Sequence, residues 1–209
     1  MVRVVFLGPP GAGKGTQAQR LARSLGVRHL STGDILRTAI HAQTPLGKEA
    51  EQFVQAGQLV PDDLVLRLLK EILNHPSTKT GYLLDGFPRN KAQAEVLESI
   101  APVDRAVYFD IPESILVQRL TQRRTCPTCG TSYNLVTQPP KAPGLCDRDG
   151  STLGQRPDDR PEAVRTRLEV YREQTAPLLS FYEERGRLRR VDASGAVDTV
   201  AQRVRAAVA

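Results

Sequence analysis

Residues 4–16 read Val4-Val5-Phe6-Leu7-Gly8-Pro9-Pro10-Gly11-Ala12-Gly13-Lys14-Gly15-Thr16. The apolar run predicts a buried strand that ends in a glycine-rich turn and opens a helix. Such a turn directs backbone N–H groups and a helix N-terminus at one point, which suits a phosphate, and Lys14 adds a mobile positive charge. The spacing from Gly8 to Gly13-Lys14 fits the P-loop, although Gly15 stands where Ser or Thr is usual and Thr16 comes one residue later. We therefore expect a nucleotide-phosphate site, with a bland glycine turn as the alternative.

The length and composition indicate one α/β domain with inserted segments. The chain has 209 residues, of which 40% are hydrophobic. No apolar run has the length of a membrane span, and no signal-peptide pattern precedes the strand that begins at Val2. We expect a soluble, cytoplasmic protein with no membrane partner.

The charge balance is basic, with a formal net charge of +6. Aromatic residues are sparse (five Phe, five Tyr and no Trp), which leaves little surface for stacking nucleic-acid bases. Six arginines within the motifs discussed below would alone equal the excess charge: Arg37, Arg89, Arg119, Arg123, Arg156 and Arg167. A small polyanionic substrate therefore explains the charge as well as a nucleic acid does, and we expect no nucleic-acid partner.

Short apolar, β-branched runs alternate with helical patterns, which predicts a parallel sheet covered by helices on both faces. The expected strands are 2–7, about 27–30, 82–84, 106–109 and 188–191. The expected helices include 17–24, 64–73 and 113–123, with helix starts at Pro61-Asp62-Asp63 and Ile111-Pro112-Glu113. A long helical stretch from Pro161 to about Arg185 is expected to kink at Pro177.

Two segments interrupt this alternation. Residues 32–60 carry two helical patterns and no strand, and we name them the helical insert. Residues 126–159, the lid segment, are rich in Pro, Gly and turn residues, have short β-like pieces such as 131–136, and are too polar for a core of their own. The sequence thus divides into core residues 1–31, 61–125 and 160–209, the helical insert and the lid segment.

The lid segment contains all three cysteines of the chain. Cys126 and Cys129 are separated by two residues, and Cys146 and Asp149 repeat this spacing, which lets a metal take two ligands from each tight turn. Three thiolates and one carboxylate would make a closed, structural tetrahedral Zn²⁺ site. The alternative is three reduced thiols in a lid without metal.

Over essentially its whole length the chain resembles adenylate kinases, specifically the long-lid type with a zinc-binding lid. The segments that carry the resemblance are 8–16, 31–37, 85–89, 118–124, the Cys/Asp pattern, 156–159 and 165–167. The resemblance implies a P-loop NTPase-type parallel sheet, with the helical insert over AMP and a small zinc-stapled β-rich lid. It also implies a nucleoside monophosphate kinase that converts MgATP and AMP reversibly to two ADP and so maintains the adenine nucleotide balance. Small kinases of this type are usually monomeric.

The resemblance implies an acceptor site for AMP. Arg37 and Arg89 would grip the AMP phosphate, since paired guanidiniums bind phosphate oxygens bidentately, and Gln93 would read the adenine edge while Thr32 helps exclude other bases. Thr32 is also placed to cap the helix that follows it, and surface positions are the alternative for Arg37 and Gln93. The implied AMP-binding set is Thr32, Arg37, Gly57, Leu59, Val60, Gly86, Arg89, Gln93, Arg156 and Arg167.

A donor site and a catalytic set are implied in the same way. Arg119 would lie over the ATP adenine, and Arg123, one helical turn later, would point the same way towards the phosphates. Asp85 follows an apolar run beside the P-loop strand, where it is placed to hold water on Mg²⁺, with a helix cap or salt bridge as the alternative. The ATP-binding set is Gly11, Ala12, Gly13, Lys14, Gly15, Thr16, Arg119 and Arg123. The catalytic set is Lys14, Asp85, Arg89, Arg123, Arg156 and Arg167.

Two other functions stay open at this stage. A UMP or CMP kinase shares much of the 85–90 motif but commonly has a short lid without cysteines. An ATP-regulated nucleic-acid-binding module would use the lid segment as a zinc ribbon, although Tyr133 is the only aromatic residue there.

Overall fold

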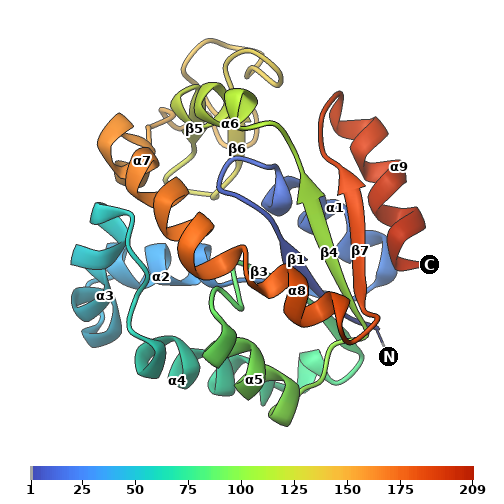
Figure 1. The fold of residues 1–209 in the computed structure, drawn as a ribbon. Helices are drawn as coiled ribbons and strands as arrows, with labels where there is room; N and C mark the ends of the chain where they lie inside the picture. The colour runs from blue at the N-terminus through green and yellow to red at the C-terminus, as the bar shows by residue number, and fades with distance from the viewer. Residues whose placement is uncertain (1) are drawn as a thin grey trace.

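The structure is a computed structural model that describes residues 2–209. Five parallel strands form its central sheet in the order β2-β3-β1-β4-β7 (Figure 1). Their bounds are β1 Val2–Leu7, β2 Arg28–Ser31, β3 Gly81–Asp85, β4 Arg105–Asp110 and β7 Leu188–Asp192. All five predicted strands are thereby confirmed to within one or two residues, as is the predicted parallel sheet.

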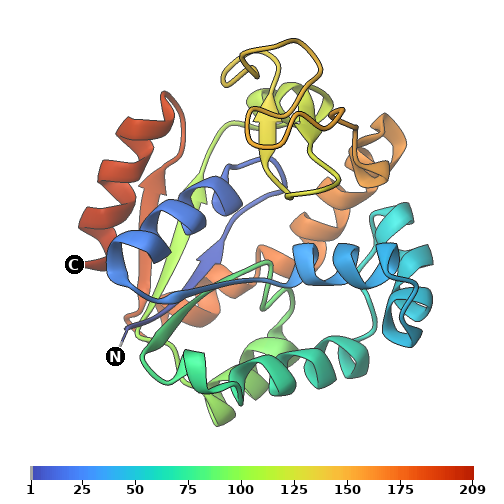
Figure 2. The same ribbon diagram turned by 180° about the vertical axis from the view of Figure 1, so that it is seen from behind.

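Helices cover both faces of the sheet, because alternate residues of each buried strand point to opposite sides. Val5 and Leu7 of β1 pack with helices α4, α5 and α8, whereas Val4 and Phe6 pack with α1, α6, α7 and α9. Figure 2 shows α1 in front of the sheet, with α9 beside it. The bounds are α1 Lys14–Leu25, α4 Asp62–Leu73, α5 Lys91–Ile100, α6 Glu113–Thr121, α7 Pro161–Val170, α8 Leu178–Glu183 and α9 Val197–Val208.

The helical insert contains two neighbouring helices, α2 (Thr32–His41) and α3 (Pro45–Ala56), in agreement with its two predicted helical patterns. The cap of α2 differs from the prediction. The hydroxyl of Ser31 accepts the N–H of Asp34 and caps the helix, whereas Thr32 is already helical and donates its own hydroxyl to the carbonyl of Gly86. Thr32 thus connects α2 to the loop after β3 and does not cap the helix.

A short two-stranded sheet connects the lid segment to the strand that precedes it. Strand β5 (Arg123–Thr125) pairs antiparallel with β6 (Ser132–Asn134), and a small buried cluster of Cys126, Tyr133 and Cys146 lies beside it. In Figure 1 the lid segment lies at the top and the helical insert at the left, and both extend beyond the sheet. A 3₁₀ turn at Pro157–Asp159 joins the lid segment to α7, and another at Pro76–Thr78 precedes β3.

One helical prediction is wrong at its C-terminal end, and another is confirmed with an irregularity beside Pro177. The helix expected over 113–123 ends at Thr121, and Arg123 is the first residue of β5, so Arg119 and Arg123 do not share a helical face. The long helix expected over 161–185 is interrupted before Pro177 by a π-helical stretch, Tyr171–Thr175. There Ala176 donates its N–H to the carbonyl of Tyr171, because the hydrogen-bond register shifts ahead of a proline that has no N–H to donate.

Among residues 2–209, no helix combines the length and the apolar character needed to cross a bilayer.

Candidate active site

The P-loop has the predicted strand–turn–helix form. β1 ends at Leu7, and α1 begins at Lys14 after a turn whose last residue, Gly13, has φ 91° and serves as the N-cap. That left-handed conformation favours glycine and leaves the first N–H groups of α1 pointing outward. The ammonium of Lys14 donates to the carbonyls of Gly8 (2.7 Å) and Pro9 (2.9 Å), which places a positive charge within the loop.

Burial lowers the pKa of Lys14 to about 8 together with the guanidiniums of Arg89, Arg167 and Arg123, while the carboxylate of Asp85 opposes the change. The ammonium therefore lies in a strongly cationic field beside one carboxylate. An anion bound here would restore the ordinary pKa of the lysine, because an opposite charge favours the protonated form.

Arg119 lies beside the P-loop, although the helical turn proposed to align it with Arg123 is absent. Its guanidinium donates to the carbonyl of Ala193 (3.3 Å for each Nη) and lies 3.9 Å from the position that a Cβ on Gly13 would occupy. The end of α6 and the turn after β7 thus hold Arg119 beside the P-loop.

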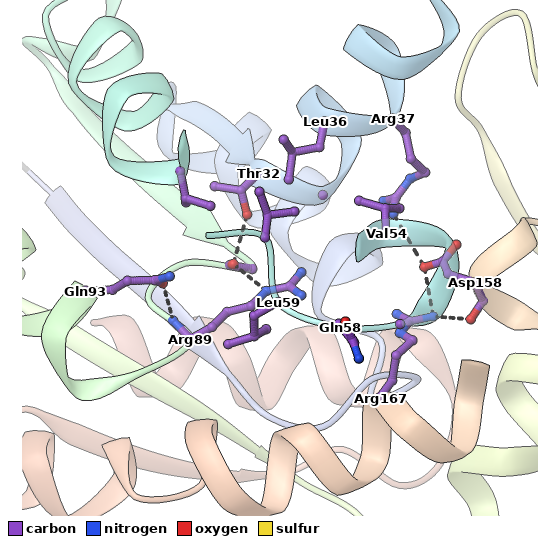
Figure 3. Close-up of a pocket in the computed structure, with 15 residues that line it drawn as sticks. Thr32, Leu36, Arg37, Val54, Gln58, Leu59, Arg89, Gln93, Asp158 and Arg167 are labelled. Atoms are coloured by element: carbon purple, nitrogen blue, oxygen red, sulfur yellow. Dashed lines mark hydrogen bonds and ion pairs between the residues drawn. The ribbon is translucent and has the colours of Figure 1, made fainter. Parts of the chain in front are cut away.

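A pocket opens between the helical insert and the core (Figure 3). It is lined by residues from α2, from the C-terminal end of α3, from the loop after β3 and from α7. Nine of the ten predicted AMP-binding residues lie around it: Thr32, Arg37, Gly57, Leu59, Val60, Gly86, Arg89, Gln93 and Arg167. The tenth, Arg156, does not line it and instead donates to the hydroxyl of Thr125 (2.9 Å).

Arg89 is fixed at one side of this pocket by two neighbours. Its Nε donates to the carbonyl of Gly86 (2.8 Å), and its carbonyl accepts the hydroxyl of Thr175 (2.7 Å). Burial lowers the pKa of Arg89, and the nearby charge of Arg37 lowers it further. The two guanidiniums are therefore held close together despite their repulsion, as a bound phosphate requires.

The carboxylates of Asp34, Asp158 and Asp159 orient the arginines. The sequence analysis predicts no role for these three residues. Arg37 contacts Asp34 (2.6 Å) and Asp158 (3.7 Å), and Arg167 contacts Asp158 (2.9 Å) and Asp159 (3.0 Å). Asp158 and Asp159 are buried, and the surrounding arginines hold the pKa of Asp158 below its usual range against the opposing effect of burial. The sequence signal for Asp158 and Asp159 is the Arg-Pro-Asp-Asp motif at 156–159.

Arg123 and Arg156 lie where β5 meets the lid segment. Arg123 pairs bidentately with Asp159, which raises the pKa of the guanidinium above its ordinary value, although burial alone would lower it. Arg156 lies 3.7 Å from Asp34, and burial together with the charges of Arg37 and Arg123 lowers its pKa to about 9. Both side chains remain cationic at neutral pH.

Asp85 ends β3, next to the P-loop strand, as predicted. Its carboxylate lies 3.2 Å from the position a Cβ on Gly15 would take, so Gly15 leaves it room. His29 of β2 places Nε2 3.8 Å from the same carboxylate. A carboxylate next to the P-loop has the donor chemistry that Mg²⁺ and its bound water prefer.

Gln93 is 2% exposed and lies in the first turn of α5, whose N-cap is Asn90. Its Oε1 accepts the backbone N–H of Arg89 (2.8 Å), and its Nε2 donates to Asp62 (2.7 Å). The same side chain lines the pocket, as do Thr32 and Leu59, and Figure 3 shows its amide against Arg89. Its placement excludes the alternative of a surface glutamine.

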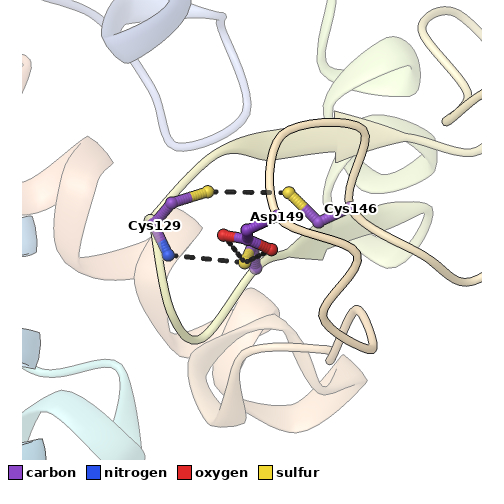
Figure 4. A group of neighbouring side chains, drawn as sticks. Cys129, Cys146 and Asp149 are labelled. Atoms are coloured by element: carbon purple, nitrogen blue, oxygen red, sulfur yellow. Dashed lines mark hydrogen bonds between the residues drawn. The ribbon is translucent and has the colours of Figure 1, made fainter.

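The four predicted metal ligands come together in the lid segment (Figure 4). One ligand atom from each of Cys126, Cys129, Cys146 and Asp149 lies within 4.8 Å of the others. The Sγ atoms of Cys129 and Cys146 are 3.5 Å apart, and Cys126 Sγ is 3.4 Å from both carboxylate oxygens of Asp149. Zinc–sulfur bonds of about 2.3 Å would space the ligands of a tetrahedral ion at nearly these distances.

The P-loop and the arginine-lined pocket lie at the same edge of the sheet, the carboxyl end, where ligands bind in folds of this kind. The two sites share the charges of Arg89, Arg123 and Arg167 around Lys14. Fold and site together define a P-loop nucleotide-binding protein with two adjoining anion sites, as phosphoryl transfer between two nucleotides requires.

Comparison with known proteins narrows this class. A family model described as "Adenylate kinase" matches residues 6–187. A protein of Thermodesulfovibrio yellowstonii named adenylate kinase is 50% identical over 204 residues, covering 95% of each chain. One of Bacillus subtilis is 48% identical over 196 residues, covering 91% of this chain and 90% of its own. One of Methanothrix thermoacetophila is 44% identical over 204 residues, covering 95% and 94%. The chain belongs to the adenylate kinase family and is thus a phosphotransferase.

Proposed function

We propose that this protein transfers the γ-phosphoryl group of MgATP reversibly to AMP and forms two ADP. The observation that carries the proposal is the pocket that holds Arg37, Arg89 and Arg167 together with the buried amide of Gln93, beside the P-loop. Guanidiniums suit a phosphate, and an amide suits a base edge, so a nucleoside monophosphate matches both. We further propose that it acts on these small nucleotides as a cytoplasmic monomer, with no nucleic-acid or membrane partner.

The reaction needs no general base in this site. The acceptor is a phosphate oxygen whose second pKa is about 6, so it is already largely ionised at neutral pH. Catalysis then consists of holding the two nucleotides in line and neutralising the charge that spreads over the transferring group. Six cations serve this purpose in our proposal, in a site whose carboxylates keep them oriented: Lys14, Arg37, Arg89, Arg123, Arg156 and Arg167.

The roles divide between the two sides of the site. We assign the ATP phosphates to the P-loop residues Gly11–Thr16, the ATP adenine to Arg119, and the transferring group to Arg123, Arg156 and Arg167. On the acceptor side, Arg37 and Arg89 hold the AMP phosphate, Gln93 and Thr32 read the base, and backbone groups of Gly57, Leu59, Val60 and Gly86 complete the pocket. Asp85 would hold Mg²⁺ through its water, and the ion supplies charge neutralisation at the phosphates.

Zinc fits the cluster in the lid segment because three thiolates and a carboxylate converge there at suitable spacing. All four protein ligands of a tetrahedral ion are supplied, so the ion would have no open position and its role is structural. We propose that it holds the lid segment together as one unit, since the segment otherwise has only a small buried cluster.

We also propose that the helical insert (32–60) closes over AMP and the lid segment (126–159) over ATP, while residues 1–31, 61–125 and 160–209 form the stable core. Closure would exclude water, which otherwise competes with AMP for the phosphoryl group.

The test follows the reaction from both directions by ³¹P NMR. The purified protein with MgATP and AMP should form ADP, and with Mg²⁺ and ADP alone should form ATP and AMP, both ending at the same composition. Hydrolysis of ATP to ADP and inorganic phosphate without consumption of AMP would contradict the proposal.

A further inference from the structure

The amide of Gln93 is held by groups that permit only one orientation. A backbone N–H can only donate, so the N–H of Arg89 requires an oxygen opposite it, and Oε1 of Gln93 lies there at 2.8 Å. An ionised carboxylate can only accept, so Oδ1 of Asp62 requires a donor, and Nε2 of Gln93 lies there at 2.7 Å. Rotating the amide by half a turn would oppose two donors at one end and two acceptors at the other.

The carboxylate of Asp62 is held in place by the side-chain amide of Asn90, whose orientation is also fixed. Oδ1 of Asn90 accepts the backbone N–H of Gln93 (2.9 Å) as the N-cap of α5, so Nδ2 of Asn90 faces Asp62 at 3.0 and 3.1 Å from its two oxygens. Asp62 begins α4, while Asn90 and Gln93 belong to the start of α5. The carboxylate therefore joins two helix starts beneath the pocket, and it does not itself line the pocket.

The locked amide keeps one N–H and one lone pair free for a ligand. Adenine presents an acceptor (N1) next to a donor (the exocyclic amine), which this orientation can satisfy. Hypoxanthine has nearly the same shape but presents a donor at N1 and an acceptor at O6, so it requires the opposite amide orientation. Which of the two patterns the site accepts thus depends on which way the amide of Gln93 points.

We propose that Asp62 is a positioning residue that sets base specificity by fixing the amide of Gln93 in the orientation that reads adenine. The proposal rests on the proposed function, in which Gln93 faces the acceptor base. Asp62 acts only through Gln93, and Arg89 supplies the second constraint through its backbone. Because the N–H that meets Gln93 belongs to the residue that grips the phosphate, base reading and phosphate binding share one short segment.

Asp62→Asn is the direct test, because asparagine keeps the size of the side chain but can donate as well as accept. The measurement is kcat/KM for AMP and for inosine monophosphate (IMP) as acceptors of phosphate from MgATP, with dissociation constants for both by calorimetry. We expect the AMP-to-IMP ratio to fall about 10- to 100-fold, the size expected when a charge-assisted hydrogen bond ceases to enforce one orientation. The fall should come from KM and the dissociation constants more than from kcat.

The matched control is Asp63→Asn, which removes the same charge from the same first helical turn. Asp63 is exposed and lies 3.8 Å from Arg67, away from Gln93. The ratio of kcat/KM for AMP to kcat/KM for IMP in this variant should equal that of the unaltered protein. A merely structural role for Asp62 would weaken AMP and IMP equally and leave the ratio unchanged, which would overturn the inference.

A second variant keeps the test decisive if Asp62→Asn does not fold. Asp62→Ser also places a group that can donate or accept near Gln93, and the same fall in the ratio is expected. Asp62→Glu retains an acceptor-only group and should recover at least part of the discrimination. Transfer to AMP with an unchanged ratio would refute the role of Asp62 alone, whereas absence of transfer to AMP in the unaltered protein would refute the proposed function itself.

Discussion

Arg123 and Asp159 form a bidentate ion pair, with Nε of the arginine 2.7 Å from one carboxylate oxygen and Nη2 against the other. Asp159 is fully buried and also accepts a hydrogen bond from Arg167 at 3.0 Å. One carboxylate thus orients two guanidiniums before any phosphate arrives, which reduces the reorganisation that charge stabilisation needs during transfer.

The first prediction concerns Arg123. Arg123→Ala should lower kcat by about 10²–10³, the loss seen when one preorganised charge donor is removed from an active site. Arg172→Ala is the control, because Arg172 pairs with Glu113 on the surface. Steady-state rates with saturating MgATP and AMP measure the effect, and equal rates for the two variants would show that Arg123 does not act in catalysis.

A parallel prediction concerns Arg89, which belongs to the acceptor side of the site. Arg89→Ala should lower turnover by a similar factor of about 10²–10³ and should also weaken AMP binding, since the guanidinium would contact the phosphate throughout the reaction. Calorimetric titration with AMP separates the binding loss from the catalytic loss. Unchanged AMP affinity would place the phosphate elsewhere.

The third prediction is a pH dependence that arises from Lys14. Its pKa of about 8 means that the ammonium loses its proton as the pH rises through this value, so affinity for MgATP should fall above pH 8. Bound phosphates favour the ammonium, so binding at pH 8.5 should take up a proton. Calorimetry in buffers of different ionisation enthalpy detects this uptake. Lys14→Arg, whose side chain stays charged, should abolish it, and persistence of the uptake in that variant would assign it to another group.

The fourth prediction concerns the metal cluster. Metal analysis should find about one zinc per chain, and strong chelation should lower the melting temperature by about 10 °C, because a ligand bound far above its dissociation constant adds several kcal/mol. Asp149→Asn should also lower it, whereas Asp147→Asn, two residues away and outside the cluster, should not. A melting curve unaffected by chelation, with no metal detected, would support three reduced thiols instead.

The fifth prediction concerns motion. Backbone relaxation should show μs–ms exchange in residues 32–60 and 126–159 of the free protein, and a bisubstrate analogue should suppress it. Identical relaxation with and without the analogue would contradict closure of the helical insert and the lid segment.

The core of the fold is predictable from sequence because its signals are local. Strands β1, β3 and β4 contain continuous apolar runs, and the P-loop is defined by glycine positions within nine residues. The Thr32 cap was wrong because two adjacent hydroxyl residues, Ser31 and Thr32, compete for one position, and only the contact with Gly86 decides between them. The helix predicted to reach Arg123 ends earlier because pairing with β6 takes over from helical hydrogen bonds at that residue.

In the site, too, local sequence signals are predictable and tertiary contacts are not. Each cation stands in a sequence motif, but several of the carboxylates that orient these cations act across the fold, as Asp34 does on Arg156 and Asp159 on Arg123. The long-range pairs depend on which loops the sheet brings together, whereas the local pair of Asp34 with Arg37 lies within one helical turn. The resemblance to adenylate kinases implies the roles of the site residues, whereas the tertiary structure shows which side chains contact them.

The most direct measurement of the central claim is an acceptor comparison. The purified protein is incubated with MgATP and, separately, with AMP, CMP, UMP or GMP, and nucleoside diphosphate formation is followed. The account predicts rapid turnover with AMP and little with the other three. Preference for a pyrimidine nucleotide would contradict the assignment of Gln93 and Thr32 to adenine, and no transfer to any acceptor would contradict the phosphotransferase function itself.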